Sequence, residues 1–359
     1  MISVKTLEER AGSNRFFWWS AAVFLGIALR FIVLYATTNF DFEHFYITAS
    51  LAAEGKNIYA STQYYNYGML FALLCGQLYK AAQYLGGSVL AYKILHVSVL
   101  TLCDFVIAKA AEKKAGTLWG ILFFLNPISI IIDGYFTQFE NIAIMFGLIG
   151  VLCVEESCGR EKFGLDDLLG VIFLSLSLIT KHFLYAFPVY ILLSTKISAR
   201  KKILYAFVPP LLFLLSFVPY WSEGSQGIIQ NVFLYRSLGN YPLLAENFWI
   251  KLGSYDASPV TNSYLFIFVS LMVISAYVFR HEDIFNSFLI YLMAVVSFAS
   301  GLSGQQLVIP CLSMILLFRE KSWPYFALII TRLAGKPAML TAESWCLLAY
   351  LVHYYRRKG

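Results

Sequence analysis

The chain has 359 residues, of which 59% are hydrophobic and only 13% are Lys, Arg, Asp or Glu. A soluble domain carries roughly a quarter charged residues, so this chain has too little charge to cover a globular surface in water. Together with a mean hydropathy of +0.67, this composition excludes a soluble enzyme, a disordered chain and a collagen-like fibre. We therefore expect an all-α polytopic membrane protein.

The charge pattern, the cysteines and the motifs indicate no nucleic-acid partner, cofactor or metal. The net charge of +6 is no sign of a nucleic-acid partner, because no stripe of Lys and Arg interleaves with aromatics in a polar segment. The six Cys fall mostly inside apolar runs without a CxxC motif, which is typical of packing residues. The sequence also lacks a DxD, a P-loop and an HExxH motif. We expect no cofactor and no metal site.

Apolar runs of spanning length recur along the chain. A spanning helix needs about 20 apolar residues, and fewer where neighbouring protein covers its ends. The first run leads straight to acidic Asp41 without a small-residue cleavage site, so we interpret it as a membrane helix and not as a signal peptide. The clear candidates for single spans are Phe16–Tyr35, Leu90–Ala110, Tyr205–Tyr220, Tyr264–Val278 and Ile284–Ala299.

Two longer apolar runs are interrupted by polar residues. Thr117–Val154 is too long for one span and is broken by the segment Asp133–Asn141. Leu168–Ser194 contains Lys181 and His182, and in a single span this cation would lie near the bilayer centre at a cost of several kcal/mol. We therefore interpret each run as a pair of helices, with the polar residues at the connecting turn.

Basic residues predict the sidedness. With a cytoplasmic N-terminus, and with Tyr64–Leu85 lying along the outer interface without crossing, most of the 27 Lys and Arg residues fall on the inner side. The positive-inside rule requires this distribution, and the arrangement predicts about 12 helices with both termini inside. We expect a single integral membrane domain over residues 1–359, with a working site on the lumenal, periplasmic or extracellular side.

The first outer loop carries acidic and basic side chains close together. Asp41 and Glu43 are two residues apart and His44 follows, which is typical of a cluster for proton transfer. A helix start explains the same residues, because Asn39 or Asp41 would cap a helix over Phe42–Glu54 and acids are favourable in its first turn. The residues alone leave both interpretations open.

The next two outer segments combine aromatic and polar residues. Tyr64–Gly68 is either part of a membrane-interface belt or a platform for sugar rings. Irregular backbone at membrane depth is tolerated where it lines a cavity, so we interpret the break at Asp133–Asn141 as a cavity wall rather than a purely structural turn. The polar side chains of that break are Asp133, Gln138, Glu140 and Asn141.

Cations mark the later outer segments. Lys181, followed by His182, is suited to a phosphate anion as a point charge, although an ordinary turn cation is the alternative. Arg236 is able to grip a phosphate through two hydrogen bonds. Asp104 lies inside Leu90–Ala110, and we assign it a packing role within the bundle.

Five segments, in order, resemble one family. They are similar to segments of the GT-C fold enzymes that transfer glucose from a polyprenyl (dolichyl) phosphate during assembly of the N-glycan lipid precursor. The family's two Pro after the Tyr are absent here, and Gly304–Gln306 replaces its later HEK-type motif. The resemblance therefore does not identify the sugar or the acceptor. The matching segments are Asp41–Thr48 for its DFEAQ-type run, Tyr65–Leu70 for its DYPPL-like stretch, Asn126–Asn141 for NP…IDHGHFQYN, Thr180–Pro188 for YKQMELY..P, and Ala245–Trp249 for VANFW.

The resemblance implies a GT-C-like bundle with interfacial helices in the first outer loop, formed by residues 1–250 and followed by C-terminal helices over 251–359. It implies an inverting transfer of a hexose from a polyprenyl-phosphate donor to a lipid-linked or envelope glycan acceptor, among membrane lipids. Asp41 would be the general base, oriented or replaced by Glu43 and His44. The donor phosphate would be held by Lys181, His182 and Arg236. The sugar or acceptor would be contacted by Tyr67, Asp133, Gln138, Glu140, Asn141, Glu246 and Asn247.

Two other functions compete with this one. A flippase or transporter of a lipid-linked saccharide would share the cavity and the basic phosphate contacts, but it would not need a carboxylate in the first outer loop. Transporters often contain inverted repeats, and the sequence has no convincing internal repeat. A non-enzymatic membrane scaffold would leave the gathering of polar clusters on one face unexplained.

Overall fold

A computed structural model describes residues 4–36, 39–234, 264–298, 304–333 and 340–358. Every regular element in these ranges is helical. By length and composition alone, four helices in this part of the chain are able to cross a membrane, and five if one bent pair counts as a single span. The protein is therefore a helical integral membrane protein. The four spans are Arg15–Tyr35, Val89–Ala115, Thr117–Phe136 and Ala199–Phe233, and the bent pair is Leu165–Thr180 with His182–Leu193.

The prediction of about 12 spans is not met by the described residues. The apolar helices Phe266–Val278 and Ile284–Phe298 are shorter than a bilayer-spanning helix. Trp323–Leu333 has only 11 residues. Counting apolar runs overestimated the number because a run cannot show where the backbone bends or leaves the α-helical pattern. The predicted boundary at residue 250 lies outside the described residues.

The two predicted helical breaks are confirmed. Thr117–Phe136 ends in a π-helical turn, and the next helix begins at Glu140. The second run bends by 116° between Thr180 and His182. In both places polar residues interrupt an apolar run, and this local signal is strong enough to locate the break.

The chain forms two compact units. Unit 1 comprises Met1–Gly147, Ser175–His182 and Leu211–Tyr235, and unit 2 comprises Leu148–Leu174, Phe183–Pro210 and Arg236–Gly359. The described elements up to the first shared helix are α1 (Val4–Ser13), α2 (Arg15–Ala36), α3 (Phe40–Ala53), α4 (Ile58–Ser61), α5 (Met69–Tyr84), α6 (Val89–Ala115), α7 (Thr117–Phe124), α8 (Pro127–Ile131) and η1 (Ile132–Phe136).

Three of the described α-helices contribute residues to both units. They are α9 (Glu140–Ser157), α10 (Leu165–Thr180) and α12 (Ala199–Leu215). The remaining elements of unit 1 are η3 (Val218–Tyr220), α13 (Trp221–Gly227) and η4 (Ile228–Phe233), and His182 of η2 (His182–Leu184) also belongs to it. Those of unit 2 are α11 (Phe187–Leu193), α16 (Tyr264–Val278), α17 (Ile284–Phe298), η5 (Gly304–Val308), α18 (Cys311–Ser313), η6 (Met314–Phe318), η7 (Arg319–Ser322), α19 (Trp323–Leu333) and α20 (Leu340–Lys358).

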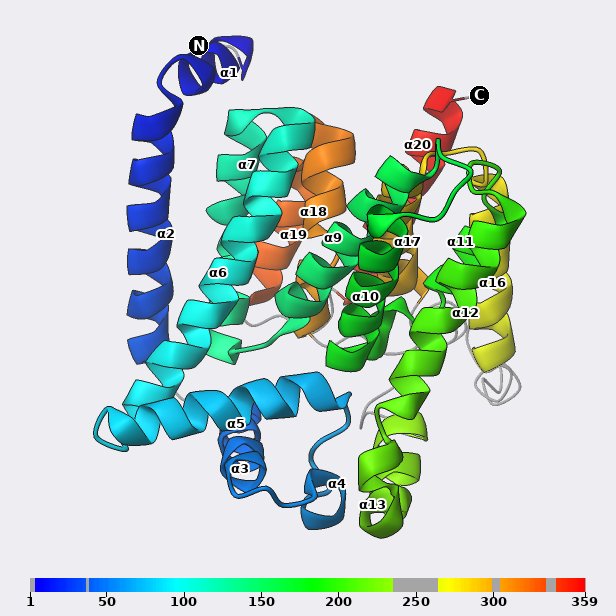
Figure 1. The fold of residues 1–359 in the computed structure, drawn as a ribbon. Coiled ribbons are helices and arrows are strands. Elements are labelled where there is room, and N and C mark those ends of the chain that lie inside the picture. The colour runs from blue at the N-terminus through cyan, green and yellow to red at the C-terminus, as the bar shows by residue number, and fades with distance from the viewer. Residues whose placement is uncertain (1–3, 37–38, 235–263, 299–303, 334–339, 359) are drawn as a thin grey trace, which may run out of the picture. The chain divides into compact units, whose positions relative to one another are not determined.

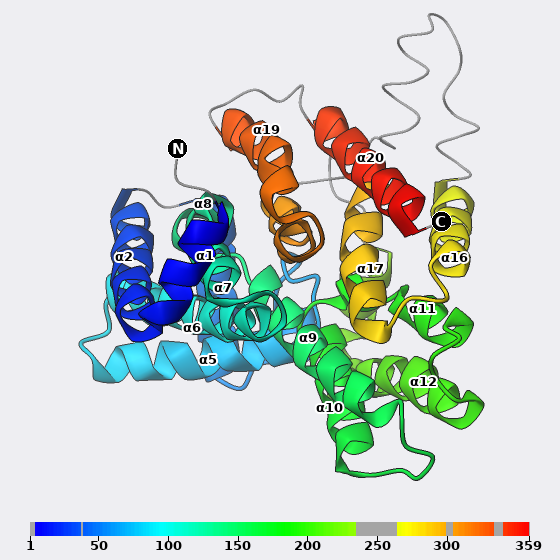
Figure 2. The same cartoon turned by 90° about the horizontal axis from the view of Figure 1, so that it is seen from above.

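In unit 1 two helices lie across the ends of the spans. Figure 1 shows α2 and α6 running lengthwise while α5 lies across one end of them, and Figure 2 shows the length of α5 from above. Helix α3 packs against α5. The placement of Tyr64–Leu85 along the outer membrane interface stays a prediction.

Local sequence explains the helix ends of unit 1. The Asn39 side chain accepts a hydrogen bond from the backbone N–H of Phe42 and so caps α3. Ser88 caps α6 in the same way. Helix α6 ends at Ala115 and is followed by Gly116, whose φ of 103° suits a residue without a Cβ. Lys113 and Lys114 lie in the last turn, beside the negative end of the helix.

Unit 2 contains a helix that is apolar all round, and such a helix is expected to be buried. Nearly every described residue of α17 is buried. The Tyr291 hydroxyl of this helix donates to the carbonyl of Phe183, and the Ser313 hydroxyl donates to the carbonyl of Leu289 at 2.7 Å. At another place in unit 2, Lys201 pairs with Asp167 at 2.9 Å.

Candidate functional site

The turn between η1 and α9 directs its side chains into unit 1. Thr137 adopts a left-handed backbone conformation with φ 51°, which is uncommon for a residue with a branched Cβ. Gln138, Phe139, Glu140 and Asn141 follow, and all are buried. The turn is therefore not a solvent-exposed connection between two helices. It forms part of the interior of the unit.

Asp133 and Asn141 belong to a buried ionic cluster. The Arg30 Nε of α2 donates to Asp133 Oδ2 at 3.0 Å, and Arg30 Nη2 donates to Asp104 Oδ2. Ser129 and Asn141 also donate to Asp104. Arg30, Asp104 and Asp133 are all fully buried. We call these five residues the Arg30 cluster. It confirms the packing role predicted for Asp104, whereas contact of Asp133 and Asn141 with a sugar stays a prediction.

Lys181 forms a second cluster with residues from two other segments. Its Nζ pairs with Glu140 Oε1 at 2.7 Å. The same Nζ lies 4.7 Å from the centre of the Tyr67 ring and 4.6 Å from that of Phe139, within reach of cation–π attraction. Lys181, Glu140, Tyr67 and Phe139 are called the Lys181 cluster below. Three of these residues were predicted separately as ligand-binding residues, and the structure brings them together.

The turn that carries Glu140 also holds buried acceptors without donors. Glu140 Oε2, Gln138 Oε1 and Asn141 Oδ1 are buried without a hydrogen-bond donor among the described residues. A buried acceptor without a donor is unfavourable by about 1–3 kcal/mol, so hydroxyl groups would bind there favourably. The groups gathered here are one paired cation, buried acceptor oxygens and two aromatic rings.

Tyr65 of the aromatic run and Tyr59, which precedes the run, have structural roles. The Tyr65 hydroxyl donates to the carbonyl of Gly68 at 2.5 Å and accepts from the N–H of Ala72 at 3.1 Å. Burial raises the pKa of Tyr65 well above its ordinary value, so the hydroxyl stays a neutral donor. Tyr59 donates to the carbonyl of Tyr67 at 2.8 Å. These bonds fix the loop that carries Tyr67 over Lys181.

Gly68 allows this loop to approach the end of α10. A Cβ on Gly68 would lie 2.0 Å from the carbonyl oxygen of Ile179, two residues before Lys181. Gly68→Ala should therefore displace Tyr67 from Lys181 and destabilise the protein by about 1–3 kcal/mol, as is typical of overpacking. Thermal unfolding in detergent would measure the loss. Gly159→Ala is the control, because a Cβ there meets nothing within 4 Å. Equal unfolding temperatures for the two variants would contradict the prediction.

The segment predicted as the first outer loop forms the start of helix α3, and the capping interpretation is confirmed for Asn39. Asp41 is half-buried and Glu43 is exposed in the first turn of this helix. The centre of the His44 ring lies 3.9 Å from that of the Tyr64 ring and 4.0 Å from that of the Phe40 ring. The ring nitrogens of His44 have no hydrogen-bond partner in the described part of the chain. The catalytic role of Asp41, Glu43 and His44 stays a prediction.

Helix α3 connects Asp41 to the turn that carries Glu140. Asp41 and Phe45 are four residues apart and so lie on one face of the helix. The Phe45 ring packs edge-on against Phe139 at 5.5 Å, next to Glu140 in the chain. The side chain of Asn39 also donates to the carbonyl of Tyr135 in η1. The structure thus anchors the first outer loop to the turn and to the Lys181 cluster.

The remaining predicted site residues are placed differently. His182 follows Lys181, is half-buried, and has an Nδ1 without a partner among the described residues. The centre of its ring lies 6.2 Å from that of the Phe213 ring. Arg236, Glu246 and Asn247 lie outside the described residues.

Sequence reasoning missed three buried basic residues of unit 1. Arg30 lies inside the first apolar run and anchors the ionic cluster. Lys93 donates to the carbonyl of Leu34 at 2.8 Å, and its amine lies 5.3 Å from the ring centre of Phe42, next to Asp41. His96 is enclosed by the rings of Phe71 and Tyr92. A charged residue within a spanning run is the signal that would have found Arg30 and Lys93.

The chain matches no protein-family model, no curated protein and no solved structure. The class of the protein therefore follows from the fold alone, as a helical integral membrane protein with buried ionic clusters in unit 1.

Proposed function

We propose that the protein is a membrane glycosyltransferase of GT-C-like architecture. It would transfer a hexose from a polyprenyl-phosphate donor to a lipid-linked or envelope glycan acceptor on the non-cytoplasmic face. The observation that carries the proposal is the Lys181 cluster, in which Tyr67, Glu140 and Lys181 meet although they come from three separate segments. Its cation, its acceptor oxygens and its aromatic rings are complementary to a phosphorylated sugar.

The proposed step is a displacement at the anomeric carbon with inversion. The acceptor hydroxyl oxygen forms a bond to this carbon while the bond from the carbon to the donor phosphate oxygen breaks, and the electron pair leaves with the phosphate. Asp41 accepts the proton of the attacking hydroxyl. Lys181 stabilises the charge that grows on the leaving phosphate, so that no acid is needed on that side. Glu140, Gln138 and Asn141 would accept hydrogen bonds from the sugar or the acceptor.

Product analysis tests the proposal directly. Purified protein in detergent would be incubated with a radiolabelled polyprenyl-phosphate hexose and a lipid extract. A larger labelled glycolipid is the result expected of a transferase, and heat-inactivated protein is the control. In reconstituted vesicles, a change in the sidedness of the labelled lipid without a new covalent product would favour the flippase instead.

Lys181→Met should raise the donor KM by about tenfold or more, because a single charged hydrogen bond contributes about 1.5–3 kcal/mol. The substitution also leaves Glu140 buried without its partner, so the double variant Lys181→Met with Glu140→Leu removes both charges together. The donor KM of both variants would be measured in the product assay.

A second buried pair provides the matched control. Lys201 pairs with Asp167 in unit 2 and is as deeply buried as Lys181. Lys201→Met should lower stability and leave the donor KM unchanged. If the double variant at Lys181 and Glu140 had wild-type kinetics, the Lys181 cluster would be a structural ion pair and the proposed donor site would be lost.

A further inference from the structure

A pocket in unit 1 is lined mainly by charged side chains that the proposed reaction does not use. It has a volume of about 470 Å³, within the usual range for ligand sites. It lies where α2 begins, α6 ends and α7 begins, at the opposite end of the lengthwise helices from α5 (Figure 1). The lining residues are Arg15, Lys109, Glu112, Lys113, Gly116 and Thr117.

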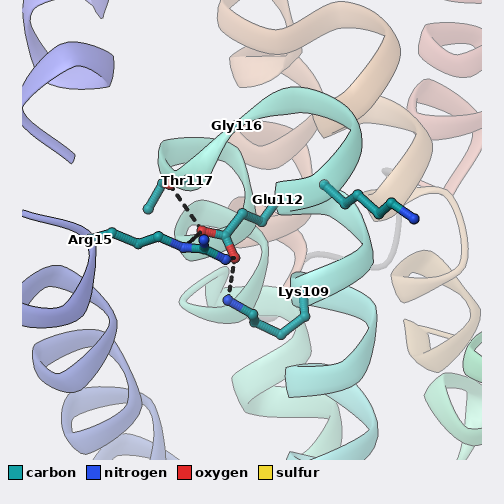
Figure 3. A pocket seen from close by; sticks show the side chains of 6 residues that line it. Arg15, Lys109, Glu112, Gly116 and Thr117 are labelled. Carbon is teal, nitrogen blue, oxygen red and sulfur yellow. Dashed lines mark hydrogen bonds and ion pairs between the residues drawn. The ribbon is translucent and has the colours of Figure 1, made fainter. Parts of the chain in front are cut away.

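Glu112 holds two of the cations in place. Figure 3 shows the side chains of Arg15 and Lys109 both meeting the Glu112 carboxylate. Arg15 Nε lies 2.7 Å from Glu112 Oε1, and Lys109 Nζ pairs with Oε2. Trp19 Nε1 and the Thr117 hydroxyl also donate to this carboxylate, each at 2.9 Å. A carboxylate has about four acceptor positions, so Glu112 has no capacity left for a ligand.

The residues that line the pocket carry more positive than negative charge, and more hydrogen-bond donors than Glu112 is able to accept. Three basic residues and one acidic residue line the pocket, and Arg15 has five N–H donors and Lys109 three, more than Glu112 accepts. The Arg15 side chain is 60% exposed, so its other donors are accessible. The pocket therefore favours an anion with several acceptor oxygens, for which Arg is well suited.

The start of α7 adds donors to the same pocket. Helix α7 begins after Gly116 without a side-chain cap, although the first N–H groups of a helix need acceptors. A Cβ at Gly116 would meet nothing within 4 Å, so there is open space beside this helix end. The partial positive charge of a helix start adds to that of the basic side chains.

The pocket lies at the ends of three candidate membrane spans. Arg15 begins one candidate span, Lys113 lies near the end of the next, and Thr117 begins a third. Phe16 is 85% exposed and Phe17 56% in the first turn of α2, as expected for aromatics at the headgroup level. We infer that this pocket binds a phosphate monoester or diester, either as the headgroup of an anionic lipid or as a free phosphate. The inference is independent of the proposed glycosyl transfer.

Binding measurements on the full chain test this site. The double variant Arg15→Gln with Lys109→Gln would be compared with the wild type in detergent, with phosphatidic acid and inorganic phosphate as separate probes, by native mass spectrometry and by thermal shift. Each basic side chain near the headgroups contributes about fivefold in affinity, so the double variant should bind phosphatidic acid about 30-fold more weakly. A matching thermal shift with inorganic phosphate would identify a soluble ligand, whereas its absence would identify a lipid.

Two control variants separate binding from folding. Arg160→Gln with Lys162→Gln removes the same charge from exposed positions of unit 2 and should change the affinity less than twofold. Glu112→Gln keeps an acceptor at the centre of the pocket and removes its negative charge, so it should tighten binding of phosphatidic acid. If the contacts of Glu112 had only a structural role, Glu112→Gln would not tighten binding of phosphatidic acid. Equal affinities of the wild type and the Arg15 and Lys109 double variant for both probes would overturn the inference.

Discussion

Asp41→Asn is expected to lower kcat of the proposed transfer by about 10²–10⁴-fold, the usual contribution of a general base. Asparagine has the shape of aspartate but cannot accept the proton of an attacking hydroxyl. The donor KM should change little, because Lys181 and not Asp41 is proposed to hold the phosphate. Initial rates of labelled glycolipid formation at saturating donor, measured on protein with an unchanged unfolding temperature, would test this.

Two variants on the same helix sharpen the test. Glu54 at the end of α3 is exposed and pairs only with Lys56 among the described residues, so Glu54→Gln should retain full activity. Glu43→Gln examines the second carboxylate of the first turn, which is exposed where Asp41 is half-buried. If Asp41→Asn had wild-type activity and Glu43→Gln lost activity, the general base would be Glu43 and the assignment of Asp41 would be refuted.

Breaks in the helices were predictable because each has a local cause. The polar residues from Asp133 to Asn141 interrupt an apolar run, and the next helix begins at Glu140. Lys181 interrupts another run, and the chain bends there by 116°. The number of spans was not predictable in this way. It depends on where helices such as Ile284–Phe298 stop, and burial against neighbours allows them to stop short of a full span.

The candidate site was predictable as a set of residues and not as a set of contacts. Tyr67, Glu140 and Lys181 each attracted notice as polar or aromatic residues at an apolar boundary, but no local pattern states that they touch. Their contact depends on Gly68 approaching the carbonyl of Ile179, which is a tertiary feature. Arg30 was missed for the opposite reason. It lies inside the first apolar run, and its ion pairs are with two carboxylates, Asp104 and Asp133, that are distant in the sequence.

Arg30→Met is expected to lower the free energy of unfolding by about 3–5 kcal/mol, the range for removing one partner of a buried ion pair. Arg30 pairs with both Asp104 and Asp133, and all three side chains are fully buried. Without the guanidinium, two carboxylates remain in an apolar interior with no positive charge between them. Chemical or thermal unfolding in detergent, followed at a fixed lipid content, would measure the loss.

The matched control is a second arginine of the same helix. Arg15 also pairs with a carboxylate, that of Glu112, but its side chain is 60% exposed, so Arg15→Met should cost no more than about 1 kcal/mol. Replacing Asp104 and Asp133 by Asn in the Arg30→Met background removes the uncompensated charges and should recover much of the stability. If Arg30→Met unfolded at the wild-type midpoint, the cluster would not stabilise unit 1. The anchoring of the turn at Asp133, and with it the position of Glu140 beside Lys181, would then need another physical cause.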